Sequence, residues 1–287
     1  MNLLKYLLIS LFIAVLFFQC SGDKDLEKAV VISDHYFLEA LINEGVDTND
    51  DGIISVGEAE DVWYLYLAGE ACLNCEGHCW NRLGIRSLSG IEAFKNLTKL
   101  VLSCTEVENL SLPKLPKLQD LSCTTNNMKS LDVSQCTALQ RLNVFDNQLT
   151  ELDVSKNEYL EYLMCSYNQL ISIDLTNNKR LDFLDCSLNK LSLLDLTNNL
   201  VLTDLRCYGN QLETIDITQN PAIKNFSCGS NKLGSLNISN NSALTEIELS
   251  GMPTLYEVCV WELPFPPFEV DVSTSDSPNI NFTMDCN

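Results

Sequence analysis

The feature that most constrains this chain is a repeat of 21 residues that runs from Leu97 to about Met252. If the first residue of each unit is position 0, apolar residues recur at positions 0, 3, 5, 10, 13 and 15, and asparagine recurs at position 8. One such unit cannot bury its own apolar face, so successive units must stack around a shared core. The regular units begin at Leu97, Leu118, Leu139, Leu160, Leu181, Leu202, Ile223 and Leu244.

The spacing resembles the leucine-rich repeat, whose pattern is L-x-x-L-x-L-x-x-N-x-L. The resemblance covers roughly 190 of the 287 residues and implies a parallel sheet with one short strand per unit. The second half of each unit is alternating and rich in β-branched residues, which favours extended segments and turns on the convex side. We therefore predict a mainly β repeat solenoid of 21-residue units with a parallel concave sheet. The position-8 column consists of Asn126, Asn147, Asn168, Asn189, Asn210 and Asn231.

Two further polar columns fall in the second half of the units. The asparagines at position 18 are predicted to cap the convex turn: Asn157, Asn178, Asn199, Asn220 and Asn241. The aspartates at position 14 are predicted to cap turns, with a ladder of cation sites as the alternative: Asp132, Asp153, Asp174, Asp195 and Asp216.

The N-terminus resembles the leader of a bacterial lipoprotein. Residues 1–19 carry one charge, Lys5, followed by an apolar run too short to span a bilayer comfortably, as expected of a signal peptide. Cys20 ends this run, in the place where lipoproteins are cleaved and lipidated, although residues 17–19 are not the usual small ones. Ordinary secretion with an incidental Cys20 is the alternative. Residues 20–32 would then be a lipidated tether.

The chain is strongly acidic, with a formal net charge of −21. This charge argues against nucleic acid and anionic lipid surfaces as partners. Divalent cations or basic partners remain compatible with it, and so does a simple role in keeping an exposed solenoid soluble.

Residues 33–61 are expected to form a helix and then a metal loop. Apolar residues at 37, 38, 41 and 42 share one helical face, and the helix is predicted to end near Gly45. The following residues match D-x-[DN]-x-[DN]-G-x5-E at every specified position and so resemble an EF-hand, without a second EF-hand to pair with. Ca²⁺ prefers oxygen ligands at this spacing, with Gly52 at the sharp turn; an acidic turn without metal is the alternative. The ligands would be Asp47, Asn49, Asp51, Ile53, Ser55 and Glu58.

A ninth unit begins at Val62 and is interrupted by a cysteine-rich insert, residues 70–83. Three cysteines and His78 lie in the insert, and Cys104 lies where the insert leaves the solenoid. An exported chain favours disulfides there, while the C-x2-C spacing also suits zinc, and free thiols are the third option. The tail is predicted to cap the core and to hold a disulfide of its own. The disulfide candidates are Cys72, Cys75, Cys79 and Cys104 in one corner and Cys259 with Cys286 in the tail, residues 253–287.

The remaining cysteines have a different explanation. In-register parallel strands keep neighbouring Cβ atoms about 4.8 Å apart, which is too far for a disulfide, so cysteines at position 5 are expected to be small buried residues. They are Cys123, Cys165, Cys186, Cys207 and Cys228, whereas Cys136 stands alone on the convex side.

Catalysis finds little support, because no nucleophile motif, metalloprotease motif or phosphate loop is present. The solvent-facing residues of the strands instead predict a binding surface at four central units, flanked by arginines. A solvated sheet that binds nothing is the alternative. The predicted patch consists of Arg141, Phe145, Tyr162, Met164, Tyr167, Phe183, Arg206 and Tyr208.

The whole chain resembles a bacterial leucine-rich-repeat surface lipoprotein with an N-terminal EF-hand-like calcium loop. That resemblance implies a non-enzymatic binding or adhesion role at the cell envelope, lipid-anchored to the outer membrane of a Gram-negative bacterium, with a protein or glycan as ligand. A structural spacer without a specific ligand is the second hypothesis, and an enzyme is a distant third. The solenoid itself is expected to span residues 62–252.

Overall fold

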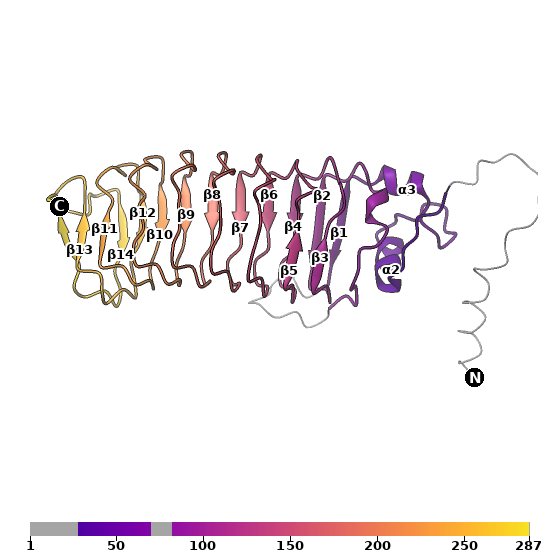
Figure 1. Cartoon of the computed structure of the whole chain (residues 1–287), viewed down its shortest axis with the longest axis horizontal. Helices are drawn as coiled ribbons and strands as arrows, with labels where there is room; N and C mark the ends of the chain where they lie inside the picture. Colours follow the sequence, from indigo (N-terminus) through magenta and orange to yellow (C-terminus); the bar gives the residue numbers. More distant parts are fainter. Residues whose placement is uncertain (1–27, 70–81, 287) are drawn as a thin grey trace, which may run out of the picture.

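The computed structural model describes residues 28–69 and 82–286. Within these residues the chain forms a long, narrow coil of stacked turns with two helices at its N-terminal end (Figure 1). The predicted signal peptide, Cys20 and the cysteines of the insert lie outside the described residues.

One parallel sheet of ten strands runs along the coil. Its register follows the repeat, so that Leu121 aligns with Leu142 and Leu163 on the next strands. The middle residue of the three-residue strands is buried in every case but β14 (Asp271–Ser273), while its neighbours form the solvent-exposed side, called the sheet face below. The strands are β1 (Tyr64–Ala68), β2 (Lys99–Ser103), β4 (Asp120–Ser122), β6 (Arg141–Asn143), β7 (Tyr162–Met164), β8 (Phe183–Asp185), β9 (Asp204–Arg206), β10 (Asn225–Ser227), β12 (Glu246–Glu248) and β14 (Asp271–Ser273).

The opposite side has only short pieces of sheet at each end and turns between them, as the repeat predicted. One piece pairs β3 (Asn109–Ser111) with β5 (Ser130–Asp132), and the other is made of β11 (Ser235–Asn237), β13 (Glu257–Cys259) and β15 (Asn281–Thr283). The position-14 aspartates cap these turns, as in Asp153, whose carboxylate accepts the N–H of Ser155 at 2.8 Å. The same contact recurs in the other four units, which agrees with turn capping.

Two buried asparagine columns join the turns. Asn168 at position 8 accepts the N–H of Leu149 and donates to the carbonyl oxygens of Val144 and Cys165, so it bonds to its own turn and to the previous one. Asn178 at position 18 donates to two carbonyl groups of the previous turn, which confirms its role in capping. Among the described residues, the five position-18 asparagines each have an Oδ1 atom without a hydrogen-bond donor.

A column of left-handed backbone at position 7 was not predicted. Tyr167 and Leu188 have φ angles of 55° and 53°, and glycines 209 and 251 occupy the same position in later turns. The chain bends sharply here from the strand toward the opposite side, and a non-glycine residue in this conformation costs about 1–2 kcal/mol. Tyr167 therefore places a bulky side chain on a backbone conformation that disfavours one.

The tail continues the coil beyond the regular repeat. β14 adds a strand to the long sheet beside β12, and β15 adds one beside β13. Asp276 has a φ of 57° and so repeats the left-handed position 7 of a further unit. Cys259 and Cys286 form the predicted disulfide across this last turn.

The N-terminal end is covered by helix α2 (His35–Asn43), the acidic loop and helix α3 (Val56–Asp61) (Figure 1). Asp34 links them to the solenoid, since one carboxylate oxygen caps α2 at Phe37 and the other accepts the N–H groups of Arg86 and Ser87. The 3-10 turn η2 (Ile91–Ala93) completes the contact with α3.

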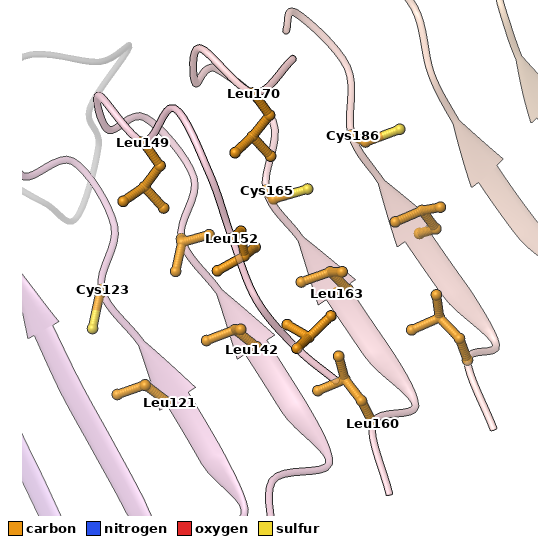
Figure 2. Packing of buried hydrophobic residues seen from close by; sticks show 14 of the residues in the cluster. Leu121, Cys123, Leu142, Leu149, Leu152, Leu160, Leu163, Cys165, Leu170 and Cys186 are labelled. Carbon is orange, nitrogen blue, oxygen red and sulfur yellow. The ribbon is translucent and has the colours of Figure 1, made fainter. Parts of the chain in front are cut away.

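At each apolar position of the repeat, every turn contributes one side chain to the core. Figure 2 shows Cys123, Cys165 and Cys186 just beyond the ends of their strands, among the core leucines. All five position-5 cysteines are fully buried and free, as predicted, and so is Cys136. Burial raises the pKa of the Cys123 thiol to about 12 and raises those of the others as well, which makes these thiols poor nucleophiles.

Candidate functional site

The predicted calcium loop is closed by its own hydrogen bonds. Asp47 is largely buried, and its two carboxylate oxygens accept the N–H groups of Asp51 and Gly52 at 3.2 and 2.8 Å. Asn49 accepts from Asp51 as well. Gly52 has the positive φ, 77°, that the predicted sharp turn requires. The first ligands of the predicted set therefore face the inside of one tight loop.

Glu58 and Ser55 form the end of this loop. They make a capping box at the start of α3, in which each side chain accepts the other residue's backbone N–H. Glu58 also accepts the N–H and the hydroxyl of Thr48 at 2.8 and 2.9 Å. Burial opposes ionisation of Glu58, but the N–H groups of Ser55 and Thr48 outweigh it and lower the pKa of the carboxyl to about 2.

The loop is also held from outside. Residues 28–30 run antiparallel to it, with hydrogen bonds from the N–H of Val30 to the carbonyl of Ile54 and from the N–H of Val56 to the carbonyl of Lys28. This short pairing gives the loop a neighbouring segment from within the same chain, whose sequence contains no second EF-hand to pair with it.

The donor set of this loop fits Ca²⁺ by chemistry, because it consists of carboxylate, amide, hydroxyl and carbonyl oxygens. Its acidic side chains are not gathered around one point: the residues that the structure describes contain no cluster of three or more His, Cys, Asp or Glu side chains able to hold a metal ion. Glu58 would have to leave or share its bonds to Thr48 and Ser55 to bind a metal bidentately.

The centre of the sheet face carries a continuous stack of rings and guanidinium groups, called the central ladder and made of Arg141, Tyr162, Phe183 and Arg206. Tyr162 and Phe183 are in register on β7 and β8, and their rings stack with centroids 4.4 Å apart and planes 9° apart. The guanidinium of Arg141 lies 4.0 Å from the ring centre of Tyr162 and that of Arg206 lies 5.3 Å from Phe183.

The rings of the ladder cover each other. In the structure each ring is half-buried by the other ring and by an arginine, so the ladder stabilises itself without a ligand. Its ring edges and the two arginines remain open to solvent.

The other predicted residues lie around the ladder. Phe145 and Tyr167 meet edge to face at 5.1 Å, and Tyr167 remains 52% exposed. The thioether of Met164 lies 3.8 Å from the hydroxyl of Tyr162. Tyr208 is half-buried and lies two turns beyond Tyr162 along the solenoid. The structure thus brings the eight predicted residues onto one face, in two ring pairs rather than one cluster.

Towards the C-terminus the sheet face becomes acidic. Asp204 pairs with Arg206 at 3.0 Å. Beyond it, β10, β12 and β14 line a shallow hollow whose carboxylates come from Glu246, Glu248 and Asp271.

A second aromatic group on the same face escaped the sequence analysis. Trp63, Tyr64 and Tyr66, called the N-terminal cluster, occupy positions 1, 2 and 4 of the interrupted unit that begins at Val62. The register signal was available: Tyr64 aligns with Lys99, in the same column as Tyr162. The insert interrupts this unit, so it does not stand among the eight regular units whose aromatic residues predicted the central patch.

The structure describes three of the six cysteines that were predicted to form disulfides. Cys104 is buried and disulfide-bonded, and Cys259 and Cys286 are joined. The remaining candidates, Cys72, Cys75 and Cys79, lie outside the described residues, as does Cys20. A search of the described part of the chain for a helix long and apolar enough to cross a membrane finds none.

No protein-family model and no curated protein matches the sequence. Solved structures do match. The functional domain of InlJ from Listeria monocytogenes, which includes a cysteine ladder, aligns over 88% of this chain and 64% of its own, with a TM-score of 0.62 and 24% identity. An internalin C2 from the same species aligns over 80% of this chain and 100% of its own, with a TM-score of 0.63 and 19% identity.

A leucine-rich-repeat protein of Leptospira interrogans aligns over 80% of this chain and 74% of its own, with a TM-score of 0.53 and 23% identity. The fold is a leucine-rich-repeat solenoid. The predicted fold class is therefore confirmed, and the buried cysteines of four successive turns form a column in this chain too. At these identities the likeness establishes the fold, and the ligand has to be argued from the chain's own residues.

Proposed function

We propose that this protein is a non-enzymatic binding scaffold of the bacterial surface that uses the centre of its sheet face to hold a protein partner. The central ladder carries this proposal. Together with Met164 beside it, the ladder combines the residue types enriched at protein interfaces, aromatic rings, arginine and methionine, in a partly exposed arrangement.

The exposed ring of Tyr167 supports the same surface. Its left-handed backbone is shared by position 7 of every regular turn and so belongs to the repeat, but its ring is held at the surface, half exposed, against Phe145. An exposed aromatic pair beside the ladder extends the surface that a partner could cover. The acidic residues beyond Arg206 favour a partner with a basic rim, because charge of opposite sign speeds association and fixes orientation.

The test is capture of surface proteins on the immobilised chain, compared with three variants. We expect Arg141→Ala and Tyr167→Ala each to weaken the captured complex at least tenfold, since truncation of a residue that dominates an interface costs about 2–4 kcal/mol. Thr124→Ala lies on the same face outside the patch and is the matched control. Equal binding by all variants would favour the second hypothesis, a spacer without a specific ligand.

We also propose that the acidic loop binds Ca²⁺ through Asp47, Asn49, Asp51, Ile53, Ser55 and Glu58, and that Cys20 carries a lipid that holds the chain at the envelope. The matching loop pattern and its pairing with residues 28–30 support the first, and the apolar run before Cys20 supports the second. Calorimetry with CaCl₂ and mass spectrometry of the mature N-terminus are the respective tests. Absence of a heat of binding would refute the calcium site, and an unmodified Cys20 would refute the lipid anchor.

A further inference from the structure

The N-terminal cluster differs from the central ladder in what covers its rings. Trp63 and Tyr64 are 6.2 Å apart at 40°, and Tyr64 and Tyr66 are 6.4 Å apart at 44°, so no two of these rings stack face to face. Trp63 is 68% exposed and Tyr64 41% exposed. In the described part of the chain, the nearest cation to these rings is Lys99, at 6.0 Å from the ring centre of Tyr64.

The solenoid does not need aromatic residues at these positions. Position 1 holds a polar residue in every regular unit, and position 2 is mostly charged or polar, so Trp63 and Tyr64 add nothing that the repeat requires. The position-1 residues are Thr98, Gln119, Gln140, Glu161, Asp182, Thr203, Lys224 and Thr245. Neighbouring apolar residues of this size at the surface mark a binding site more often than a packing need.

The charges near the cluster select the kind of ligand. Lys99 forms an ion pair with Asp120 at 3.0 Å, so its charge is neutralised. The chain as a whole carries a formal charge of −21, which repels anions. An uncharged ligand is therefore favoured over an acidic one.

We propose that Trp63, Tyr64 and Tyr66 form a stacking site for a neutral oligosaccharide, separate from the protein site at the central ladder. The C–H groups of a pyranose ring carry a weak positive charge and pack against the negative face of an aromatic ring, while its hydroxyl groups stay in water. The two exposed rings of Trp63 and Tyr64, with the half-buried ring of Tyr66 beside them, offer tilted faces to consecutive sugar units. The central ladder does not, since its ring faces are covered by each other and by arginines.

The experiment titrates the full chain with four neutral hexasaccharides, built from glucose in β-1,4 or α-1,4 linkage, N-acetylglucosamine or mannose, and with anionic hexagalacturonate. Calorimetry and tryptophan fluorescence measure binding. The variants Trp63→Gln and Tyr64→Asn introduce residues that the repeat itself uses at these positions, as Gln119 and Asn225 do. Tyr162→Asn is the control at the same register position in the ladder.

We expect at least one neutral hexasaccharide to bind, Trp63→Gln and Tyr64→Asn to raise its Kd at least tenfold, and Tyr162→Asn to leave it unchanged. The unfolding midpoint of each variant shows that the solenoid is intact. Binding of none of the neutral probes at millimolar concentration, preference for the anionic probe, or equal binding by Trp63→Gln would overturn the proposal. Loss of a captured protein in Trp63→Gln without any sugar binding would assign the cluster to the protein interface instead.

Discussion

The central ladder and the N-terminal cluster lie on the same face of one sheet, with Tyr64 and Tyr162 in one register column, yet their rings are arranged differently. In the ladder, Tyr162 and Phe183 lie nearly parallel between two arginines and are half-buried. In the cluster, Trp63 and Tyr64 are tilted and exposed. Aromatic residues in adjacent turns, one repeat apart, stack because parallel in-register strands place them about 4.8 Å apart, while residues within one turn cannot. Rings in the ladder therefore contribute to stability, and rings in the cluster remain free for a ligand.

The largest difference should appear in stability. We expect Tyr162→Asn combined with Phe183→Asn to lower the free energy of unfolding by about 2–3 kcal/mol, because half-buried area and a stacked pair are lost together. Trp63→Gln should change it by less than about 0.5 kcal/mol. Urea denaturation measures both, and equal losses in the two regions would break the comparison.

Acid and removal of Ca²⁺ should each destabilise the N-terminal end of the molecule, where the N-terminal cluster lies, before they destabilise the rest. The pKa of Glu58 is lowered to about 2 from its ordinary value of 4.5, so its contribution to stability is complete above pH 4.5 and is lost as the pH falls towards 2. Glu58→Gln keeps a side chain that can complete the capping box but replaces charged hydrogen bonds by neutral ones, so it should cost about 1 kcal/mol and remove this pH dependence. We expect amide exchange to rise in α2, α3 and β1 and not in β7 or β8.

Removal of Ca²⁺ with a chelator should produce the same local pattern if the loop binds the ion, with a lower melting temperature. Exchange that rises uniformly along the solenoid would mean that the N-terminal helices are not a separate unit. An unchanged pattern after chelation would count against the calcium proposal alone.

A smaller effect is expected at Tyr167. Glycine occupies the same position of the repeat at Gly209. Replacing Tyr167 by glycine relieves about 1–2 kcal/mol of backbone strain. It also loses the contact with Phe145 and makes the unfolded chain more flexible, and both of these changes lower stability. The free energy of unfolding should therefore change by less than about 1 kcal/mol, while capture of the protein partner weakens. A strongly destabilised Tyr167→Gly variant would show that the ring serves the fold and not a partner.

The smallest effect concerns the thiols beneath the ladder. Cys165 and Cys186 are buried under β7 and β8, and their raised pKa values keep them protonated. We expect no alkylation in the native protein and complete alkylation of the six free cysteines in denaturant, with Cys259 and Cys286 protected until they are reduced. Modification of Cys165 in the native state would show that the ladder region opens.

The sequence by itself determined the solenoid, the register of its strands and the burial of the position-5 cysteines, because a strict 21-residue period allows only one way to stack apolar residues. It also determined which residues share the sheet face. It did not predict the left-handed position 7, since residues as different as Tyr167, Leu188 and Gly209 occupy it. Nor did it predict that the coil would continue to β15 after the leucine pattern ends.

Only the tertiary structure decided which aromatic rings are covered. Tyr162 and Phe183 are 21 residues apart, and their rings stack because successive turns bring the same position of the repeat together. Trp63 and Tyr64 are neighbours in the chain, but their ring planes are tilted by 40° and do not stack. It also decided what pairs with the acidic loop, a single antiparallel bridge from Ala29 to Ser55 that no motif predicts. A period specifies which positions align, but the contacts of individual side chains depend on rotamers and neighbouring turns that a one-dimensional pattern does not contain.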